Sequence, residues 1–160
     1  MITTSEEAKA AVQSLGLPRI FADVWDDNIP ITLVDWQRPK RYFSYHNELL
    51  KRYPRLATCI PLWESNRDHV YAFDTATNEF ITCNYYEERY LEVIADSYQR
   101  FAAAYLVECI YSGDEELDEI GSLLEFKHMH ELHKFAETDH KDLSADEAKQ
   151  QFVESIPADR

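Results

Sequence analysis

A change in the period of the apolar residues constrains the fold of this chain more than any other feature. Residues 1–55 and 97–160 place apolar side chains at helical spacing, whereas residues 56–86 contain runs rich in β-branched and aromatic residues. The runs, separated by polar turns that begin at Glu64 and Thr75, are Leu56–Trp63, His69–Asp74 and Glu79–Tyr86. This pattern predicts an antiparallel meander between two helical regions, and therefore an α+β fold.

Local signals indicate where the predicted elements begin and end. Capping boxes at Thr4 and Ser144 mark the first and last helices, since a glutamate follows each of them three residues later. Asp96 and Ser97 are the predicted caps of the most apolar helix, which Gly113 ends and which is expected to pack across the sheet. Pro61 has no amide hydrogen, so its strand is expected to lie at an edge or to carry a bulge there. The predicted helices are 4–15, 18–28, 42–53, 97–112, 114–124, 127–138 and 144–156, and a further strand is predicted at 31–36.

Length and composition favour one folded domain. The chain has 160 residues, of which 45% are hydrophobic and 13% aromatic, so it can bury enough apolar surface to offset the entropy of ordering. No segment has the composition of a linker. We predict a single domain over residues 1–160, with a core at about 5–112 and a C-terminal helical extension at 114–160.

Charge and residue usage exclude several classes of ligand. The 30 acidic and 16 basic side chains give a net charge of −14, which repels nucleic acid and anionic membranes, and 3 glycines are too few for a glycine-rich phosphate loop. The acidity either keeps the protein soluble or steers a basic partner toward it. A polar segment after Met1 and the lack of a long apolar stretch predict a cytoplasmic protein. The absence of a CxxC pair predicts reduced, buried thiols at Cys59, Cys83 and Cys109.

No pattern in the sequence favours catalysis. His130, His133 and Glu137 would share one face of a helix, but the HExxH spacing of zinc enzymes is absent. We therefore expect no bound metal and no cofactor. The cysteines lack a histidine partner and no GxSxG elbow occurs, so we expect no catalytic nucleophile and no enzyme.

Two polar segments are candidate partner-binding sites. The first is the acidic run, which comprises Asp114, Glu115, Glu116, Asp118 and Glu119. Its charges either form the solvated start of a helix or offer an anionic patch to lysines and arginines of another protein. The second is the turn that contains Glu64, Asn66, Arg67 and Asp68, which is expected at the sheet's end together with the turn Thr75–Asn78. The tryptophans either anchor an interface or fill the core, and they are Trp25, Trp36 and Trp63.

Several short motifs follow one another in a characteristic order. The first helix ends in Leu15-Gly16-Leu17-Pro18, the strand Val70-Tyr71-Ala72-Phe73-Asp74 follows a polar loop, and Ser97-Tyr98-Gln99-Arg100-Phe101 opens a later helix. In these motifs the chain resembles the SUKH superfamily of bacterial toxin-immunity proteins and cell-wall-synthesis regulators, over about residues 5–112. The family often has a glycine in the turn before its Asp-bearing strand. This chain has Asn66 and Asn78 in its turns, and asparagine tolerates the left-handed conformation.

The resemblance implies an α+β fold and a role in binding other proteins, without catalytic residues. The expected partner is another protein, in particular a basic toxin domain that the chain would neutralise. Regulation of cell-wall or glucan synthesis is the alternative, and a metal-dependent hydrolase is a distant third. Fold analogy supplies most of this functional step.

Overall fold

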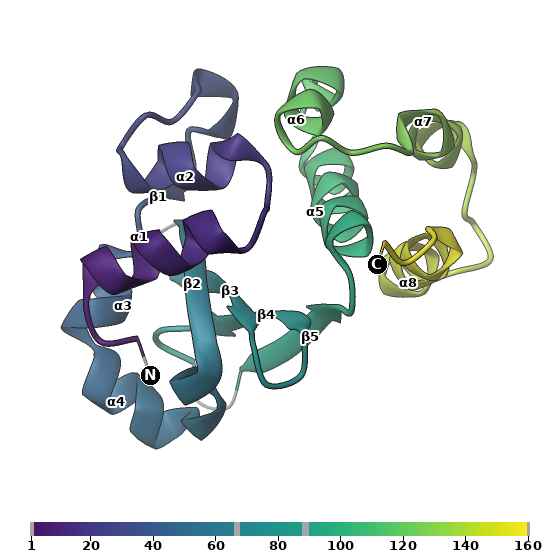
Figure 1. Cartoon of the computed structure of the whole chain (residues 1–160). Helices are drawn as coiled ribbons and strands as arrows, with labels where there is room; N and C mark the ends of the chain where they lie inside the picture. The colour runs from purple at the N-terminus through teal and green to yellow at the C-terminus, as the bar shows by residue number, and fades with distance from the viewer. Residues whose placement is uncertain (1, 66–67, 88–89, 160) are drawn as a thin grey trace. The chain divides into compact units, whose positions relative to one another are not determined.

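Antiparallel strands form a meander in which sequence neighbours are also neighbours in the sheet (Figure 1). The structure is a computed structural model that describes residues 2–65, 68–87 and 90–159. The predicted meander and α+β fold are confirmed. The strands among the described residues are β1 Trp36–Gln37, β2 Cys59–Ser65, β3 His69–Asp74, β4 Glu79–Asn84 and β5 Leu91–Ala95.

The register of β2 confirms the irregularity that Pro61 predicts. Pro61 lies opposite Ala72 and Trp63 lies opposite Tyr71, so Leu62 is the extra residue of a β-bulge. Proline cannot donate a ladder hydrogen bond, and a bulge is a position that tolerates the missing donor.

Stacked aromatic rings form part of the core beside the sheet. The rings of Trp36 and Trp63 stack with centroids 4.0 Å apart, and the ring of Tyr71 stacks 4.3 Å from that of Trp63. Phe21 packs against both tryptophans, at 5.8 and 5.7 Å. Trp25 is buried as well, so the core interpretation of the tryptophans is confirmed.

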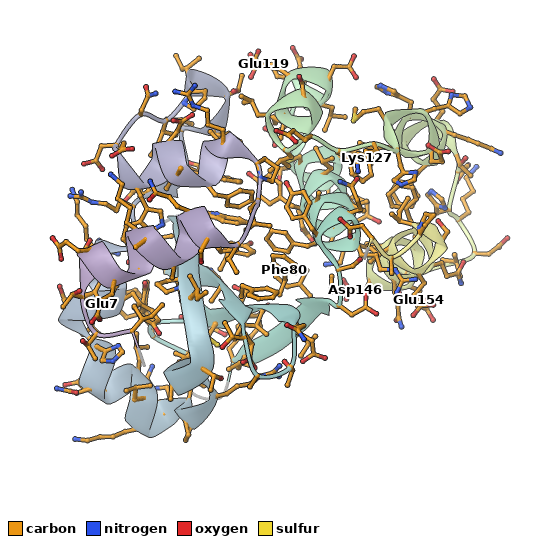
Figure 2. All side chains as sticks on the ribbon, in the orientation of Figure 1. Glu7, Phe80, Glu119, Lys127, Asp146 and Glu154 are labelled. Carbon is orange, nitrogen blue, oxygen red and sulfur yellow. The ribbon has the colours of Figure 1, made fainter. Side chains whose placement is uncertain are left out.

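Short helices and 3-10 turns accompany the sheet in the N-terminal part of the chain. The predicted capping box is present at the start of the first helix, near the labelled Glu7 in Figure 2. The Thr4 hydroxyl accepts a hydrogen bond from the Glu7 N–H at 3.2 Å, and the Glu7 carboxylate accepts one from the Thr4 N–H at 3.2 Å. The elements are α1 Ser5–Ser14, α2 Arg19–Trp25, η1 Ile31–Leu33, α3 Lys40–Ser44, α4 His46–Arg52 and η2 Pro54–Thr58.

The strand predicted at residues 31–36 is wrong. A 3-10 turn occupies the first three of these positions, and Trp36 alone of the six pairs with the sheet. Leu33 and Trp36 are buried, whereas Ile31 and Val34 are exposed. Side chains three apart lie on the same side of a 3-10 turn. The apolar run therefore includes a solvent-facing pair that hydrophobicity alone does not distinguish from core residues.

Two further details differ from the prediction. The helix predicted at 42–53 is divided at Tyr45, whose φ of −105° and ψ of 10° interrupt the helical backbone between α3 and α4. The stripe of apolar residues continues through this position, so the sequence pattern does not reveal the break. The sequence prediction also ends the sheet at Tyr86 and omits β5. Within β5 only Ala95 is buried, so the strand lacks the alternation that would predict it.

The chain divides into two compact units, Met1–Ile94 and Ala95–Arg160. In the second unit α5 packs against α6, α7 and α8. The single domain predicted over 1–160, with its core at about 5–112 and its extension at 114–160, stays a prediction, as does the packing of the long helix across the sheet. The helices of the second unit are α5 Tyr98–Ser112, α6 Leu117–Leu123, α7 Met129–Glu137 and α8 Ala145–Ser155.

The ends of these helices follow their local signals, with one exception. Gly113 ends α5 with a φ of 78°, and the N–H of Asp114 donates to the carbonyl of Cys109 at 3.0 Å, as a glycine terminator predicts. The capping box at Ser144 is confirmed. Capping of α5 by the hydroxyl of Ser97 is wrong. Its backbone is strongly extended, with a φ of −152°, and the side chain makes no cap hydrogen bond.

Within residues 2–65, 68–87 and 90–159, no helix combines the length and the apolar character that crossing a membrane requires.

Candidate functional site

Glu64, which was expected to face a partner, is buried instead. It lies in β2, which continues to Ser65, and it is 2% exposed. A polar residue at the end of an apolar run predicts a turn, but here the strand buries it. Asn66 and Arg67 lie outside the described residues. Asp68 is half-buried in the turn immediately before β3.

Hydrogen-bond donors meet at the carboxylate of Glu64. Its Oε1 accepts from the backbone N–H of Tyr42 at 3.0 Å and from the hydroxyl of Tyr85 at 2.6 Å. Burial raises the pKa of Glu64, while these hydrogen bonds and the charge of Arg41 oppose the rise. Burial also raises the pKa of Tyr85, and the nearby carboxylate raises it further. Glu64 is therefore an internal acceptor that fixes the side chain of Tyr85.

Tyr85 belongs to a group of tyrosines in the first unit. Its ring centroid is 6.4 Å from that of Tyr45 and 6.5 Å from that of Tyr86. The hydroxyl of the buried Tyr53 accepts a hydrogen bond from the backbone N–H of Tyr90 at 3.1 Å. Tyr45, Tyr86 and Tyr90 are 45%, 63% and 38% exposed. We call these three exposed side chains the tyrosine surface.

Acidic side chains border the tyrosine surface. The hydroxyl of Tyr90 donates to Oε2 of Glu92 at 3.1 Å. The ring of His69 packs edge-on against the ring of Tyr90, with centroids 5.6 Å apart. Nδ1 of His69 lies 2.8 Å from Oδ1 of Asp68. Two of the candidate residues of the predicted turn are described in the structure. Asp68 lies beside the tyrosine surface, whereas Glu64 supports that surface from inside the protein.

A guanidinium already contacts the same group of tyrosines. Nη1 of Arg52 donates to the carbonyl of Tyr85 at 2.6 Å, and its guanidinium carbon lies 6.0 Å from the ring centroid of Tyr53. The N–H of Tyr85 donates to the carbonyl of Asp68 at 2.7 Å. The backbone of Tyr85 is therefore held on both sides, and its hydroxyl is held by Glu64.

The turns Glu64–Asp68 and Thr75–Asn78 do not lie together as predicted. They join β2 to β3 and β3 to β4, and successive turns of an antiparallel meander alternate between opposite ends of the sheet. Asn78 has a φ of 57°, which confirms that asparagine adopts the left-handed conformation there. The Thr75–Asn78 turn therefore contributes nothing to the tyrosine surface.

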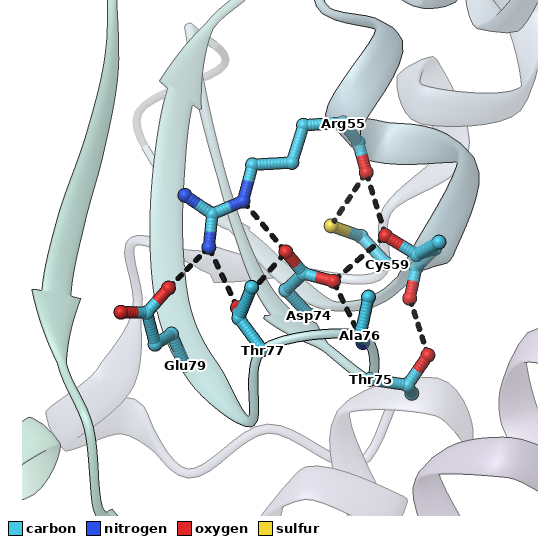
Figure 3. A network of polar contacts seen from close by, with 8 residues as sticks. Arg55, Cys59, Asp74, Thr75, Ala76, Thr77 and Glu79 are labelled. Atoms are coloured by element: carbon cyan, nitrogen blue, oxygen red, sulfur yellow. Dashed lines mark hydrogen bonds and ion pairs between the residues drawn. The ribbon is translucent and has the colours of Figure 1, made fainter.

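A polar network fills the sheet end at Thr75–Asn78 (Figure 3). Asp74 is 1% exposed. Arg55 forms ion pairs with both Asp74 and Glu79. Burial alone would raise the pKa of Asp74, but the donors outweigh it and lower this pKa from 3.8 to about 2. The network thus clamps the β3–β4 hairpin to η2. The Asp74 carboxylate accepts from Arg55 Nε at 2.6 Å, Thr58 Oγ1 at 2.7 Å, Ala76 N at 3.0 Å and Thr77 Oγ1 at 3.1 Å.

The acidic run is exposed and belongs to the second unit. Because α6 begins at Leu117, Asp118 and Glu119 lie in its first turn (Figure 2), where negative charge favours the helix dipole. Oδ1 of Asp118 lies 2.7 Å from Nε2 of His133 in α7. This geometry fits a solvated helix start, and a role of the run in partner binding stays a prediction.

The histidine-rich helix and the cysteines were the catalytic candidates. His130, His133 and Glu137 are exposed on α7. Among the described residues, no three His, Cys, Asp or Glu side chains are placed to hold a metal ion. The cysteines are free and buried as predicted, and burial raises the pKa of each thiol to about 12, so the nucleophilic thiolate is scarce at neutral pH.

Sequence reasoning missed the tyrosine surface, although a signal was present. The chain has 10 tyrosines against 8 phenylalanines, and Tyr85, Tyr86 and Tyr90 lie close together in the sequence. Tyrosine is enriched at protein interfaces, so this density favours a binding surface. Which of the rings are exposed depends on the fold and cannot be read from their spacing.

The chain matches no protein-family model, no curated protein and no solved structure. The resemblance to the SUKH superfamily therefore stays a prediction that rests on the short motifs.

Proposed function

We propose that this chain is a non-enzymatic protein-binding domain that neutralises a basic bacterial toxin domain, as the resemblance to the SUKH superfamily implies. The observation that carries the proposal is the tyrosine surface, which Asp68 and Glu92 border. A tyrosine ring contributes a large contact area at a low cost in conformational entropy. The net charge of −14 supports a basic partner, because it attracts one over a long range.

The internal use of the reactive groups supports binding rather than catalysis. Glu64 is engaged by Tyr42 and Tyr85, and Asp74 is engaged by Arg55. The thiols are buried with pKa values raised to about 12. Free thiols also support a reducing compartment, and we place the function in the cytoplasm.

Growth protection tests the proposal. We predict that a gene adjacent to that of the chain encodes a toxic domain. When that domain is co-expressed in bacteria with the chain, the wild type is expected to restore growth. A triple variant, Tyr45→Ala with Tyr86→Ala and Tyr90→Ala, should not restore it. Tyr111→Ala is the matched control, because Tyr111 is 43% exposed but lies in the second unit.

Circular dichroism of the purified variants establishes that each is folded before growth is compared. A folded triple variant that protects as well as the wild type would show that the tyrosine surface does not bind the toxin. If the adjacent gene instead encodes a cell-wall or glucan enzyme that the chain binds, the regulatory alternative replaces toxin neutralisation.

A further inference from the structure

We infer that the tyrosine surface selects arginine side chains of the partner. The inference rests on the proposed function and adds the chemical group that the surface recognises. A guanidinium is planar, weakly hydrated and able to stack on an aromatic ring while it donates to carboxylates in its own plane. A lysine ammonium is compact, strongly hydrated and has no plane to stack.

The exposed rings offer faces to such a planar group. The rings of Tyr45 and Tyr86 both lie near that of Tyr85, at 6.4 and 6.5 Å between centroids, and both residues are exposed. Tyr90 contributes a further exposed ring at the side where His69 packs. Arginine and tyrosine are both enriched at the centre of protein interfaces.

Arg52 shows how this group of tyrosines accommodates a guanidinium. It approaches the ring of Tyr53 to 6.0 Å and donates from Nη1 to the carbonyl of Tyr85 at 2.6 Å. A cation–π approach to a ring and donation to an oxygen therefore occur together in one side chain of the chain itself. Its guanidinium is directed to the inner Tyr53, whereas Tyr45 and Tyr86 carry the exposed rings.

The charges at the border favour a cation. Glu92 accepts from the hydroxyl of Tyr90, and Asp68 contacts the histidine that packs on the same ring. A guanidinium that stacks at this side of the surface can donate to carboxylates without displacing a tyrosine. The overall charge of −14 attracts the same cation from a distance.

The inner ring of Tyr85 and the backbone of Tyr86 are held in position before any partner arrives. The hydroxyl of Tyr85 is bound by Glu64, its N–H by the carbonyl of Asp68 and its carbonyl by Arg52. The N–H of Tyr86 donates to Oδ1 of Asn84 at 2.7 Å. A surface ordered in advance loses less entropy on binding, which makes contacts of modest strength effective.

Matched peptides test the selectivity. Three peptides that alternate glycine with arginine, lysine or citrulline are titrated into the isotope-labelled full chain, and the tyrosine ring resonances are followed by NMR. The arginine peptide should shift the rings of Tyr45 and Tyr86 and bind several-fold more tightly than the lysine peptide. The uncharged citrulline peptide should not bind. Tyr86→Ala should lower the affinity for the arginine peptide about two- to five-fold, and Tyr111→Ala should leave that affinity unchanged.

The outcomes separate this inference from the proposed function. Equal affinity for the arginine and lysine peptides, or shifts confined to the acidic run, would overturn arginine selection. If arginine selection is overturned in this way but the triple tyrosine variant fails to protect cells, the tyrosine surface remains the partner site and only the inference of arginine selection is rejected. If the triple variant protects like the wild type, the proposed site itself is overturned.

Discussion

Replacement of Asp74 by asparagine measures how strongly a buried carboxylate stabilises the first unit. The donors around Asp74 lower its pKa from 3.8 to about 2. A carboxyl whose pKa is lower in the folded chain stabilises that chain above its unfolded pKa, and this stabilisation is lost as the pH falls through the folded pKa. A shift of this size corresponds to about 2 kcal/mol in the free energy of unfolding at neutral pH. Asp74→Asn keeps the size of the side chain but removes the charge that Arg55 pairs with, so it should lose about this amount.

Urea unfolding followed by tryptophan fluorescence is the assay, because all three tryptophans lie in the first unit. The free energy of unfolding of the wild type exceeds that of Asp74→Asn. At pH 3 this excess should fall to about half of its value at neutral pH, because part of the wild-type stabilisation is lost there. Asp142→Asn changes an exposed carboxyl in the second unit and should alter the free energy of unfolding by less than about 0.5 kcal/mol. A loss for Asp74→Asn no larger than that of the control, or a difference that does not shrink at pH 3, would refute the reasoning.

Glu64 should show the opposite pH dependence, because burial raises its pKa. In the same urea assay the wild type should gain stability relative to Glu64→Gln as the pH falls through that raised pKa, and a change in the other direction would contradict the burial argument. The buried thiols should react slowly with a disulfide-exchange reagent in the native chain and fully after denaturation, and labelling within seconds at neutral pH would reopen cysteine catalysis. Elemental analysis of the untagged protein should find no stoichiometric zinc; one zinc per chain that is lost in His133→Ala would overturn this expectation. Neutralising the acidic run should slow association with the toxic domain at low salt while changing the free energy of unfolding by no more than about 1 kcal/mol, and an unchanged association rate and salt dependence would exclude the run from recognition.

The sequence predicts those parts of the fold that depend on local periodicity and capping. The meander follows from runs rich in β-branched and aromatic residues between polar turns. Thr4, Ser144 and Gly113 mark helix ends because the caps they form satisfy backbone groups locally. The strand predicted at 31–36 fails because hydrophobicity does not tell which apolar side chains face solvent. Ile31 is exposed in a 3-10 turn, although it belongs to a segment rich in apolar residues.

The candidate site is harder to predict because it depends on tertiary packing. Glu64 has the polarity of a turn residue, and its burial requires donors from Tyr42 and Tyr85, which are distant in sequence. Tyr45 and Tyr86 are brought to the same ring of Tyr85 only by the fold. The sequence therefore supplies the residue types of the surface, while their exposure and mutual contacts come from the structure.

The affinity of the purified chain for the toxic domain that the proposed function predicts in the adjacent gene tests the central claim most directly. Calorimetric titration compares the wild type, the triple tyrosine variant and Tyr111→Ala. The tyrosine surface as partner site predicts that the triple variant raises the Kd by about 100-fold or more, since truncation of interface anchors commonly costs this much. Tyr111→Ala should leave the Kd unchanged. A folded triple variant that binds as tightly as the wild type would contradict the claim.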